Sequence, residues 1–136
     1  MGGASLILLD SHVLLWLAMD SQRLSRRAAS AIRRAKSSDG IAVASITLWE
    51  LALMFARGRV RGFGTAEAST RLVVEQTGAI VKQITPEIAA LATQFSGDYP
   101  SDPADRLIGA TARAEALLLV TRDERIRSSP LLNTLW

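Results

Sequence analysis

The amino-acid sequence predicts a single α/β domain over residues 1–136, built on a mainly parallel sheet of four to five strands that is flanked by helices. Short apolar runs alternate with longer segments of helical character, and this alternation is typical of a parallel sheet. The strand candidates are continuous apolar runs, as strands must be when helices cover both faces of their sheet. The sequence shows neither an internal repeat nor an interdomain linker.

The chain begins with one strand and two helices. Residues 5–9 are short and apolar, which predicts a buried strand. A helix over Ser11–Met19 follows, with Asp10 or Ser11 as its N-cap. Residues 25–37 form a second predicted helix with an alanine-rich side and an arginine-rich side.

The middle of the chain repeats this order of strand and helices. Ile41–Ala44 is the second predicted strand, and Ser45 is expected to cap an apolar helix that runs to about Arg57. After a glycine-rich loop, residues 65–77 are helical up to Gly78, a common C-cap residue.

The last part of the chain contains two helices that begin with proline, which is favoured at the first helical position. The predicted elements are a strand over 79–84, a helix that begins at Pro86 after the capping residue Thr85, a helix from Pro103 to about Ala116, a strand over 117–120 and a short edge strand over 131–136.

The composition excludes several kinds of chemistry. The sequence has no cysteine and a single histidine, His12. Thiolate nucleophiles, disulfides, cysteine-ligated metals and mechanisms that need two histidines are therefore excluded. The 14 arginines far outnumber the 2 lysines, and the net charge is +3. Because the arginine fork suits phosphate oxygens, this excess favours a nucleic-acid partner, although a GC-rich coding bias produces the same excess.

The apolar runs are too short for a membrane span. The longest cover residues 6–9 and 13–19, whereas a spanning helix needs about 18–20 apolar residues. The first residues also lack the basic leader of a signal peptide. We therefore expect a cytoplasmic protein without a membrane partner.

Two aspartates follow predicted strands directly. Asp10 comes after the first strand and Asp123 comes shortly after the fourth. Ligand sites of open parallel sheets gather at the carboxyl ends of the strands, so both aspartates are candidate site residues. The alternatives are that Asp10 caps the next helix and that Asp123 is an ordinary loop residue.

Two further acids lie on predicted helices. Glu50 is the one charged residue between Ser45 and Arg57, so we expect it to be buried or nearly so. A buried carboxylate needs a cation or a proton, and pairing with an arginine is the alternative to a functional role. Asp105 follows Asp102, and these two residues are also consistent with a capping box at the start of a helix.

The four acids together predict a metal site. Their places at strand ends and helix starts allow Asp10, Glu50, Asp105 and Asp123 to converge at one edge of the sheet. Two carboxylates about 4 Å apart repel by roughly 4 kcal/mol at an effective dielectric of 20, so such a cluster needs a cation. An all-oxygen ligand set favours Mg²⁺ or Mn²⁺.

The order of these acids resembles the PIN-domain ribonucleases, and within them the VapC toxins of toxin–antitoxin pairs. The strings LLDSHVLLWL, SITLWELALMFARGRV, DPADRLIGATA and LLLVTRD each resemble one VapC branch. The resemblance extends from Leu6 to Trp136. It implies a PIN-like three-layer sandwich and a metal-dependent endoribonuclease that leaves 5′-phosphate and 3′-hydroxyl ends.

The resemblance also implies roles for individual residues. Asp10 and Asp105 would bind Mg²⁺ or Mn²⁺ most directly, and Glu50 and Asp123 would complete the acidic cluster, partly through metal-bound waters. His12 is not implied as a ligand. The hydroxyl groups that would hydrogen-bond to the acids are those of Thr121 and of Ser45 or Thr47.

Partners are implied as well: an RNA substrate, a small antitoxin that covers the site, and a second copy of the chain in a homodimer. Trp16, Trp49 and Phe55 would contact these protein partners or else pack in the core. Arginines near the acids would hold the RNA backbone unless they are ordinary surface charges, and Arg106 would alternatively pair with an acid. These candidates are Arg57, Arg59, Arg61, Arg106, Arg122 and Arg125.

Other readings of the sequence remain open. The chain lacks the Asp-x-Asp of haloacid-dehalogenase-like phosphatases, the acidic pair of receiver domains and the Gly-x-x-x-x-Gly-Lys of nucleotide-binding loops. A catalytically inactive RNA- or protein-binding module, or a PIN-fold RNA-processing nuclease without an antitoxin, would share the same fold.

Overall fold

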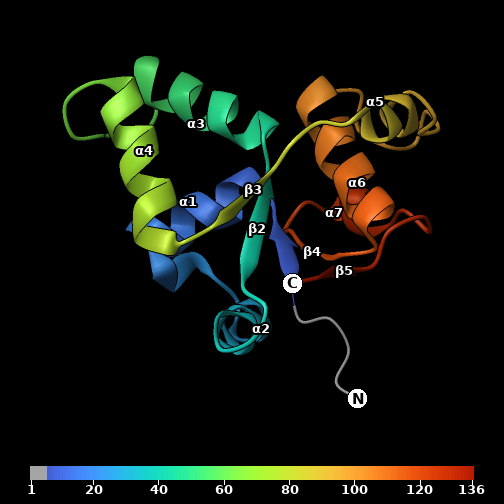
Figure 1. The fold of residues 1–136 in the computed structure, drawn as a ribbon, viewed down its shortest axis with the longest axis horizontal. Helices are drawn as coiled ribbons and strands as arrows, with labels where there is room; N and C mark the ends of the chain where they lie inside the picture. The colour runs from blue at the N-terminus through green and yellow to red at the C-terminus, as the bar shows by residue number, and fades with distance from the viewer. Residues whose placement is uncertain (1–5) are drawn as a thin grey trace.

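The protein is described by a computed structural model over residues 6–136, in which five strands form one sheet (Figure 1). The strand order is β3-β2-β1-β4-β5, and all four neighbouring pairs are parallel. The strands are β1 (Ile7–Leu9), β2 (Ile41–Ala44), β3 (Ile80–Lys82), β4 (Leu118–Val120) and β5 (Thr134–Leu135). The first predicted strand is confirmed from Ile7. Ser5, the first residue of that predicted strand, lies outside the described residues. So do the first residues of the chain, on which the expectation of no basic leader rests.

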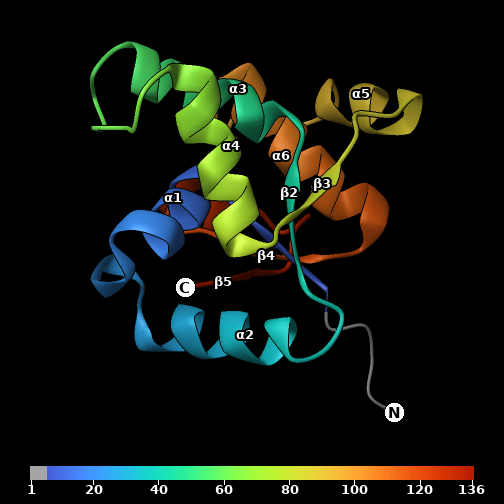
Figure 2. The same ribbon diagram turned by 60° about the vertical axis from the view of Figure 1, so that its left-hand side comes forward.

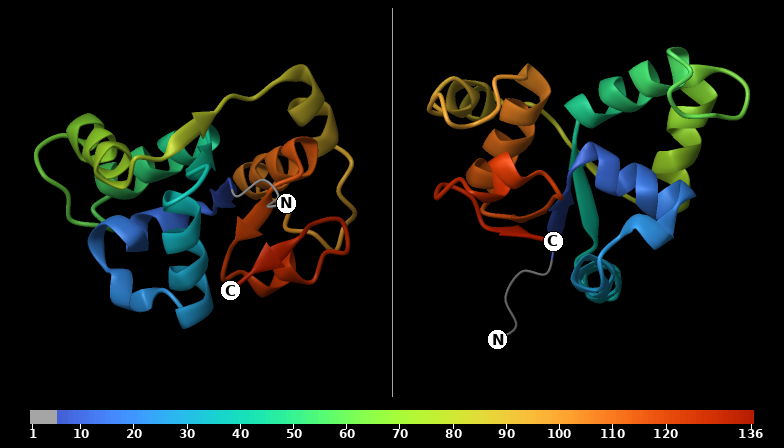
Figure 3. Two further views of the ribbon diagram at one scale, coloured as in Figure 1. Left: turned by 60° about the horizontal axis from the view of Figure 1, so that its bottom comes forward. Right: turned by 180° about the vertical axis from the view of Figure 1, so that it is seen from behind.

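Helices lie on both sides of this sheet, so the molecule has three layers (Figures 1 and 3). The α-helices are α1 (Ser11–Met19), α2 (Arg26–Lys36), α3 (Ile46–Ala56), α4 (Ala66–Thr77), α5 (Pro86–Ala92), α6 (Pro103–Glu115) and α7 (Glu124–Arg127), and a 3₁₀ turn, η1, covers Ser21–Arg23.

The central strands bury side chains on both faces, as their continuous apolar character predicts. Ile7 and Leu9 of β1 pack in one core with residues of α1 and α2. Leu8, between them, packs in the opposite core with residues of α5, α6 and α7. The edge strand β3 differs, because Ile80 is 45% exposed and just three residues of the predicted strand over 79–84 pair with β2.

Most predicted helix ends are confirmed by their capping geometry. Ser25, Thr65 and Thr85 each accept a hydrogen bond from a backbone N–H of the first turn. Gly78 ends α4 at φ 68°, a left-handed conformation that glycine adopts without strain. Two short elements, η1 and α7, were not predicted, because three or four residues are too few to show a helical period.

Ser45 occupies the predicted N-cap position of α3, but its side chain does not cap the helix. Ser45 precedes α3 with φ −60° and ψ −27° and makes no side-chain capping hydrogen bond. A capping side chain reaches the first-turn N–H groups when its own backbone is extended, and the backbone of Ser45 is already helical.

The parallel strands place several chain segments at one edge of the sheet (Figure 2). Leu9 pairs with Val120, so the segments that leave β1 and β4 begin side by side. The backbone N–H of Asp10 donates to the Val120 carbonyl at 3.0 Å. No helix within residues 6–136 is long and apolar enough to cross a membrane.

Candidate active site

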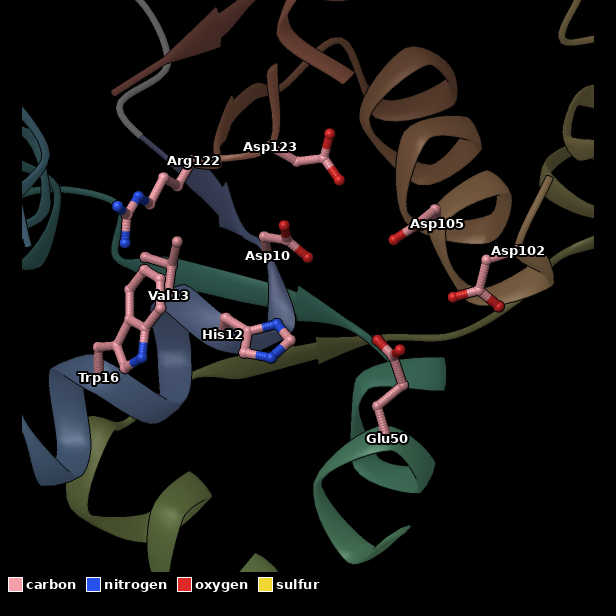
Figure 4. A pocket seen from close by; sticks show the side chains of 9 residues that line it. All are labelled: Asp10, His12, Val13, Trp16, Glu50, Asp102, Asp105, Arg122 and Asp123. Atoms are coloured by element: carbon pink, nitrogen blue, oxygen red, sulfur yellow. The ribbon is translucent and has the colours of Figure 1, made fainter. Parts of the chain in front are cut away.

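A cavity of about 430 Å³ opens where β1 and β4 end (Figure 4). Carboxylates from four different segments point into this space (Figure 4). We refer to it as the acidic cavity. Its lining consists of Asp10, His12, Val13, Trp16, Glu50, Asp102, Asp105, Arg122 and Asp123, and so includes all four acids that the sequence singles out.

Asp10 lines the acidic cavity and also caps α1, so the two places that the sequence left as alternatives are compatible. Its side chain caps α1, because Oδ1 accepts a hydrogen bond from the Ser11 N–H at 2.8 Å. Oδ2 accepts a second hydrogen bond from the Thr121 hydroxyl at 2.7 Å. The residue is 9% exposed, and this burial raises the pKa of the Asp10 carboxyl despite both hydrogen bonds.

Thr121 joins Asp10 to Asp123. The Thr121 hydroxyl donates to Asp10 and accepts a hydrogen bond from the Asp123 N–H at 3.1 Å. Oδ1 of Asp123 in turn accepts from the Arg125 and Ile126 N–H groups, at 2.9 and 3.3 Å, and so caps α7. Asp123 is therefore a helix cap that also borders the acidic cavity, rather than an ordinary loop residue.

Glu50 is held by a short chain of hydroxyl groups. The Ser11 hydroxyl donates to Oε1 of Glu50 at 2.6 Å and lies 2.8 Å from the Thr47 hydroxyl. Because Ser11 has one hydroxyl hydrogen, and Glu50 takes it, Thr47 must donate to Ser11. No described arginine pairs with Glu50. The residue is half-buried, less than the sequence indicated, and burial is the main cause that raises its pKa.

Asp105 has a strongly perturbed carboxyl group. Burial, followed by the charges of neighbouring acids with Asp10 first, raises its pKa from 3.8 to about 7. No described residue donates a hydrogen bond to this carboxylate, so the capping box that the sequence allowed does not close. Asp102 alone caps α6, accepting from the Ala104 N–H at 3.4 Å.

The first turn of α6 is fixed from behind by aromatic side chains. The Tyr99 hydroxyl donates to the backbone carbonyl of Asp105 at 2.8 Å, and its ring stacks on Phe95 at 4.0 Å. Gly109 leaves the room that this arrangement needs, because a Cβ there would lie 2.3 Å from the Tyr99 hydroxyl oxygen. The position of Asp105 therefore depends on a packed unit that the sequence motif does not reveal.

The predicted arginines fall into three groups. Arg122 borders the acidic cavity, and Arg57 and Arg59 line an adjoining groove of about 300 Å³. Arg61 and Arg125 are exposed and border neither of these two spaces. Arg106 pairs with no described acid: its guanidinium donates to the carbonyls of the loop between α5 and α6. The distances are 3.0 Å to Phe95 and 3.4 Å to Ser96.

The carboxylates fit a magnesium or manganese ion that keeps most of its water. Within residues 6–136, no three acidic or histidine side chains lie close enough together to ligate one ion directly. Mg²⁺ is typically bound through one or two carboxylates plus several waters, so a closed protein cage is not required. Burial and neighbouring negative charge both raise the pKa values of Asp10, Glu50 and Asp105. A divalent cation would offset the negative charge.

Four residues at the site were not singled out for it from the sequence. Asp102 and Ser11 were interpreted only as capping residues. The sequence therefore did not indicate that Asp102 lines the acidic cavity or that Ser11 contacts Glu50. His12 borders both the acidic cavity and the groove, and Arg23 borders the groove. The closeness of Asp102, the N-cap of α6, to Asp105 in the first turn of the same helix was a usable signal for Asp102.

The comparisons with known proteins agree with this geometry. Residues 7–130 match the family described as PIN domain. The chain is 39% identical over 132 residues to Ribonuclease VapC22 of Mycobacterium tuberculosis (strain ATCC 25618 / H37Rv), covering 96% of this chain and 98% of that protein. The chain therefore belongs to the PIN-domain family, and within it to the VapC group.

Solved structures show the same fold. A DNA-bound VapBC from Salmonella typhimurium superposes with a TM-score of 0.68 at 19% identity, covering 95% of this chain and 96% of that one. A toxin–antitoxin complex from Klebsiella pneumoniae gives a TM-score of 0.65 at 21% identity, with 96% of both chains covered. At these identities the likeness concerns the fold, which confirms the predicted PIN-like sandwich.

Proposed function

We propose that this protein is a Mg²⁺- or Mn²⁺-dependent endoribonuclease that acts as the toxin of a toxin–antitoxin pair. The observation that carries the proposal is the convergence of Asp10, Glu50, Asp105 and Asp123 on one cavity of a PIN fold. The relative named Ribonuclease VapC22, similar over nearly the whole chain, supports the same activity.

The acids have distinct parts in this proposal. Asp10 and Asp105 would hold the metal most directly, and Glu50 and Asp123 would complete the acidic cluster, partly through waters on the metal. A bound metal ion supplies charge that polarises the scissile phosphate and lowers the pKa of a coordinated water. Thr121 and Ser11 keep Asp10 and Glu50 oriented, because each donates a hydrogen bond to one carboxylate oxygen.

The substrate is a phosphodiester of RNA. Arg57 and Arg59 line a groove that shares His12, Trp16 and Glu50 with the acidic cavity. Positive charge therefore lies directly beside the acids, where it balances the phosphates on either side of the bond to be cut.

The proposal is tested by cleavage of a labelled pool of structured RNA by purified protein that is free of antitoxin. Wild-type protein, Asp10→Asn and the control Asp98→Asn are assayed with Mn²⁺, and wild type also with EDTA. Asp98 is exposed and does not line the acidic cavity. We expect cleavage by wild type and Asp98→Asn with Mn²⁺, and 5′-phosphate ends. Cleavage that survives EDTA or Asp10→Asn would overturn the proposal. Binding of RNA without any cleavage would support an inactive binding module instead.

The partner is an antitoxin protein, and the working form is a homodimer in the cytoplasm. A DNA-bound VapBC and a toxin–antitoxin complex of known structure share this fold. Trp49 is 58% exposed on α3, which suits a protein contact, whereas Trp16 is buried and Phe55 packs against the core.

Growth and molecular mass test these partner assignments. Expression in a bacterium is expected to arrest growth, and co-expression of the protein encoded beside it is expected to restore growth. Equal growth with wild type and Asp10→Asn would argue against the toxin role, and a monomeric mass in light scattering would argue against the homodimer.

A further inference from the structure

Trp16 of α1 is surrounded by two arginines and two aromatic rings. The guanidinium carbons of Arg23 and Arg122 lie 5.6 and 6.0 Å from the centre of its indole ring. The rings of His12 and Trp136 each lie 5.9 Å from the same indole ring. The tryptophan is 9% exposed, while Arg23 and Arg122 are themselves exposed. The indole ring of Trp16 is thus buried, while the two arginines that lie over it face solvent. We refer to this ring as the platform.

Arg122 has an unusual position for a cation beside an acidic cluster. It adjoins Asp123 in sequence and borders the acidic cavity, yet it forms an ion pair with no described residue. Its side chain points toward Trp16 instead of toward the carboxylates (Figure 4). The positive charge of Arg122 therefore lies near the acids without forming an ion pair with them.

Arg23 also lies over the Trp16 ring, but it borders a different space. It borders the groove that also contains Arg57 and Arg59. Its single described ion pair, with Asp20, is long at 3.5 Å and exposed, so it competes weakly with an incoming anion. Trp16 borders both the groove and the acidic cavity, and the two arginines lie one in each.

We propose that Trp16 holds Arg23 and Arg122 as a pair of phosphate-binding groups, between which the RNA strand passes from the groove into the acidic cavity. This inference rests on the proposed function and adds to it the residues that position the strand. A guanidinium that packs against an indole face keeps its N–H groups in the plane of the fork and available to phosphate oxygens. Trp16 is a positioning residue here, because it acts through the arginines.

The test compares Arg23→Ala and Arg122→Ala with a matched control, Arg34→Ala. Arg34 is an exposed arginine of α2 that borders neither the groove nor the acidic cavity. Binding of a labelled single-stranded RNA pool is measured in an Asp105→Asn background, so that binding is read without cleavage. We expect each site variant to weaken binding about tenfold and to reduce the salt dependence of log K by about 0.7, as loss of one phosphate contact on a single strand does. Arg34→Ala is expected to match its parent.

Kinetics and a tryptophan variant test the platform itself. In protein that retains Asp105, Arg23→Ala is expected to raise KM while kcat stays within about twofold, because the residue binds phosphate away from the reacting atoms. Trp16→Leu is expected to weaken RNA binding as much as the two arginine changes together, and to add nothing when both arginines are already alanine. If Trp16→Leu fails to fold, Trp16→Phe replaces it, with a smaller effect of the same sign.

The outcomes separate this inference from the proposed function. Equal RNA affinity for Arg23→Ala, Arg122→Ala and Arg34→Ala would overturn the inference, even if the wild-type protein cleaves RNA. An additive effect of Trp16→Leu in the double arginine variant would overturn the platform role. RNA binding that depends on both arginines, in a protein that cleaves nothing, would support the inference and contradict the nuclease. A wild-type protein that neither binds nor cleaves RNA with Mn²⁺ would contradict both.

Discussion

The hydroxyl of Thr121 donates a hydrogen bond of 2.7 Å to Oδ2 of Asp10, although the two residues are 111 positions apart in the chain. Both groups are buried, and each follows one of two paired central strands. The hydrogen bond is therefore a direct consequence of the parallel pairing of β1 with β4. It holds one carboxylate oxygen of Asp10 in place. The pairing of the two strands therefore orients the Asp10 carboxylate.

Removing the Thr121 hydroxyl tests whether this hydrogen bond stabilises the protein and holds Asp10 in place. Thr121→Val keeps the shape of the side chain but leaves Oδ2 of Asp10 buried without its donor, which is expected to cost about 1–3 kcal/mol of unfolding free energy. The pKa of Asp10 is expected to rise further, because the hydrogen bond lowers it at present. Urea unfolding measures the stability. Thr121→Ser, which restores the hydroxyl, is expected to recover most of it, and equal stability for the valine and serine variants would contradict this account.

Ser11 gives a second test, on the other side of the cavity. Ser11→Ala removes the donor to Glu50 and also leaves the Thr47 hydroxyl without its acceptor. We expect a fall in kcat for RNA cleavage of about tenfold and a stability loss of about 1 kcal/mol. Steady-state kinetics with Mn²⁺ provide the measurement. Unchanged kcat in a folded Ser11→Ala protein would show that the orientation of Glu50 is set without Ser11.

Gly109 tests the unit behind Asp105. In Gly109→Ala the new Cβ would lie 2.3 Å from the Tyr99 hydroxyl oxygen and 2.9 Å from Cζ of Phe95, so the aromatic pair must move. Overpacking of this kind is expected to cost about 1–3 kcal/mol in thermal or urea unfolding. Pairing Gly109→Ala with Tyr99→Phe removes the closest clash and is expected to restore part of the loss. A fully stable Gly109→Ala protein would contradict the close approach.

Much of the fold was predictable because its signals are local. The apolar runs at Ile41–Ala44 and in β1, with helical patterns between them, indicated a parallel sheet, and the sheet edge then brought Asp10 and Asp123 together. The missing capping hydrogen bond of Ser45 could not be predicted, because composition does not reveal that the backbone of this N-cap residue is already helical. The hydrogen bonds of Arg106 to loop carbonyls and the packing of Tyr99 on Gly109 depend on tertiary contacts, which no local pattern encodes.

The raised pKa values predict how stability depends on pH. The pKa of Asp105 is about 7 in the folded protein, above its ordinary value of 3.8. Between about pH 4 and pH 7 the metal-free folded state therefore holds a proton that the unfolded chain releases, so the free energy of unfolding falls as pH rises through this window. Asp10 and Glu50 act in the same direction.

Metal binding reverses this trend, because protons and a divalent ion compete for the same carboxylates. Differential scanning fluorimetry with and without Mn²⁺ is expected to show a stabilisation by the metal that is small near pH 5 and larger near about pH 8. Asp105→Asn is expected to flatten the metal-free pH dependence. A stabilisation by Mn²⁺ that is equal at both pH values would count against carboxylate ligation.

The central claim is that the acidic cavity binds a catalytic metal, and anomalous diffraction from crystals grown with Mn²⁺ tests it most directly. The account predicts an anomalous peak in the cavity bounded by Asp10, Glu50, Asp105 and Asp123, with Asp10 and Asp105 nearest to the ion and no peak in crystals of Asp10→Asn. A fully occupied peak elsewhere, or an empty cavity in crystals of a protein that cleaves RNA with Mn²⁺, would contradict it.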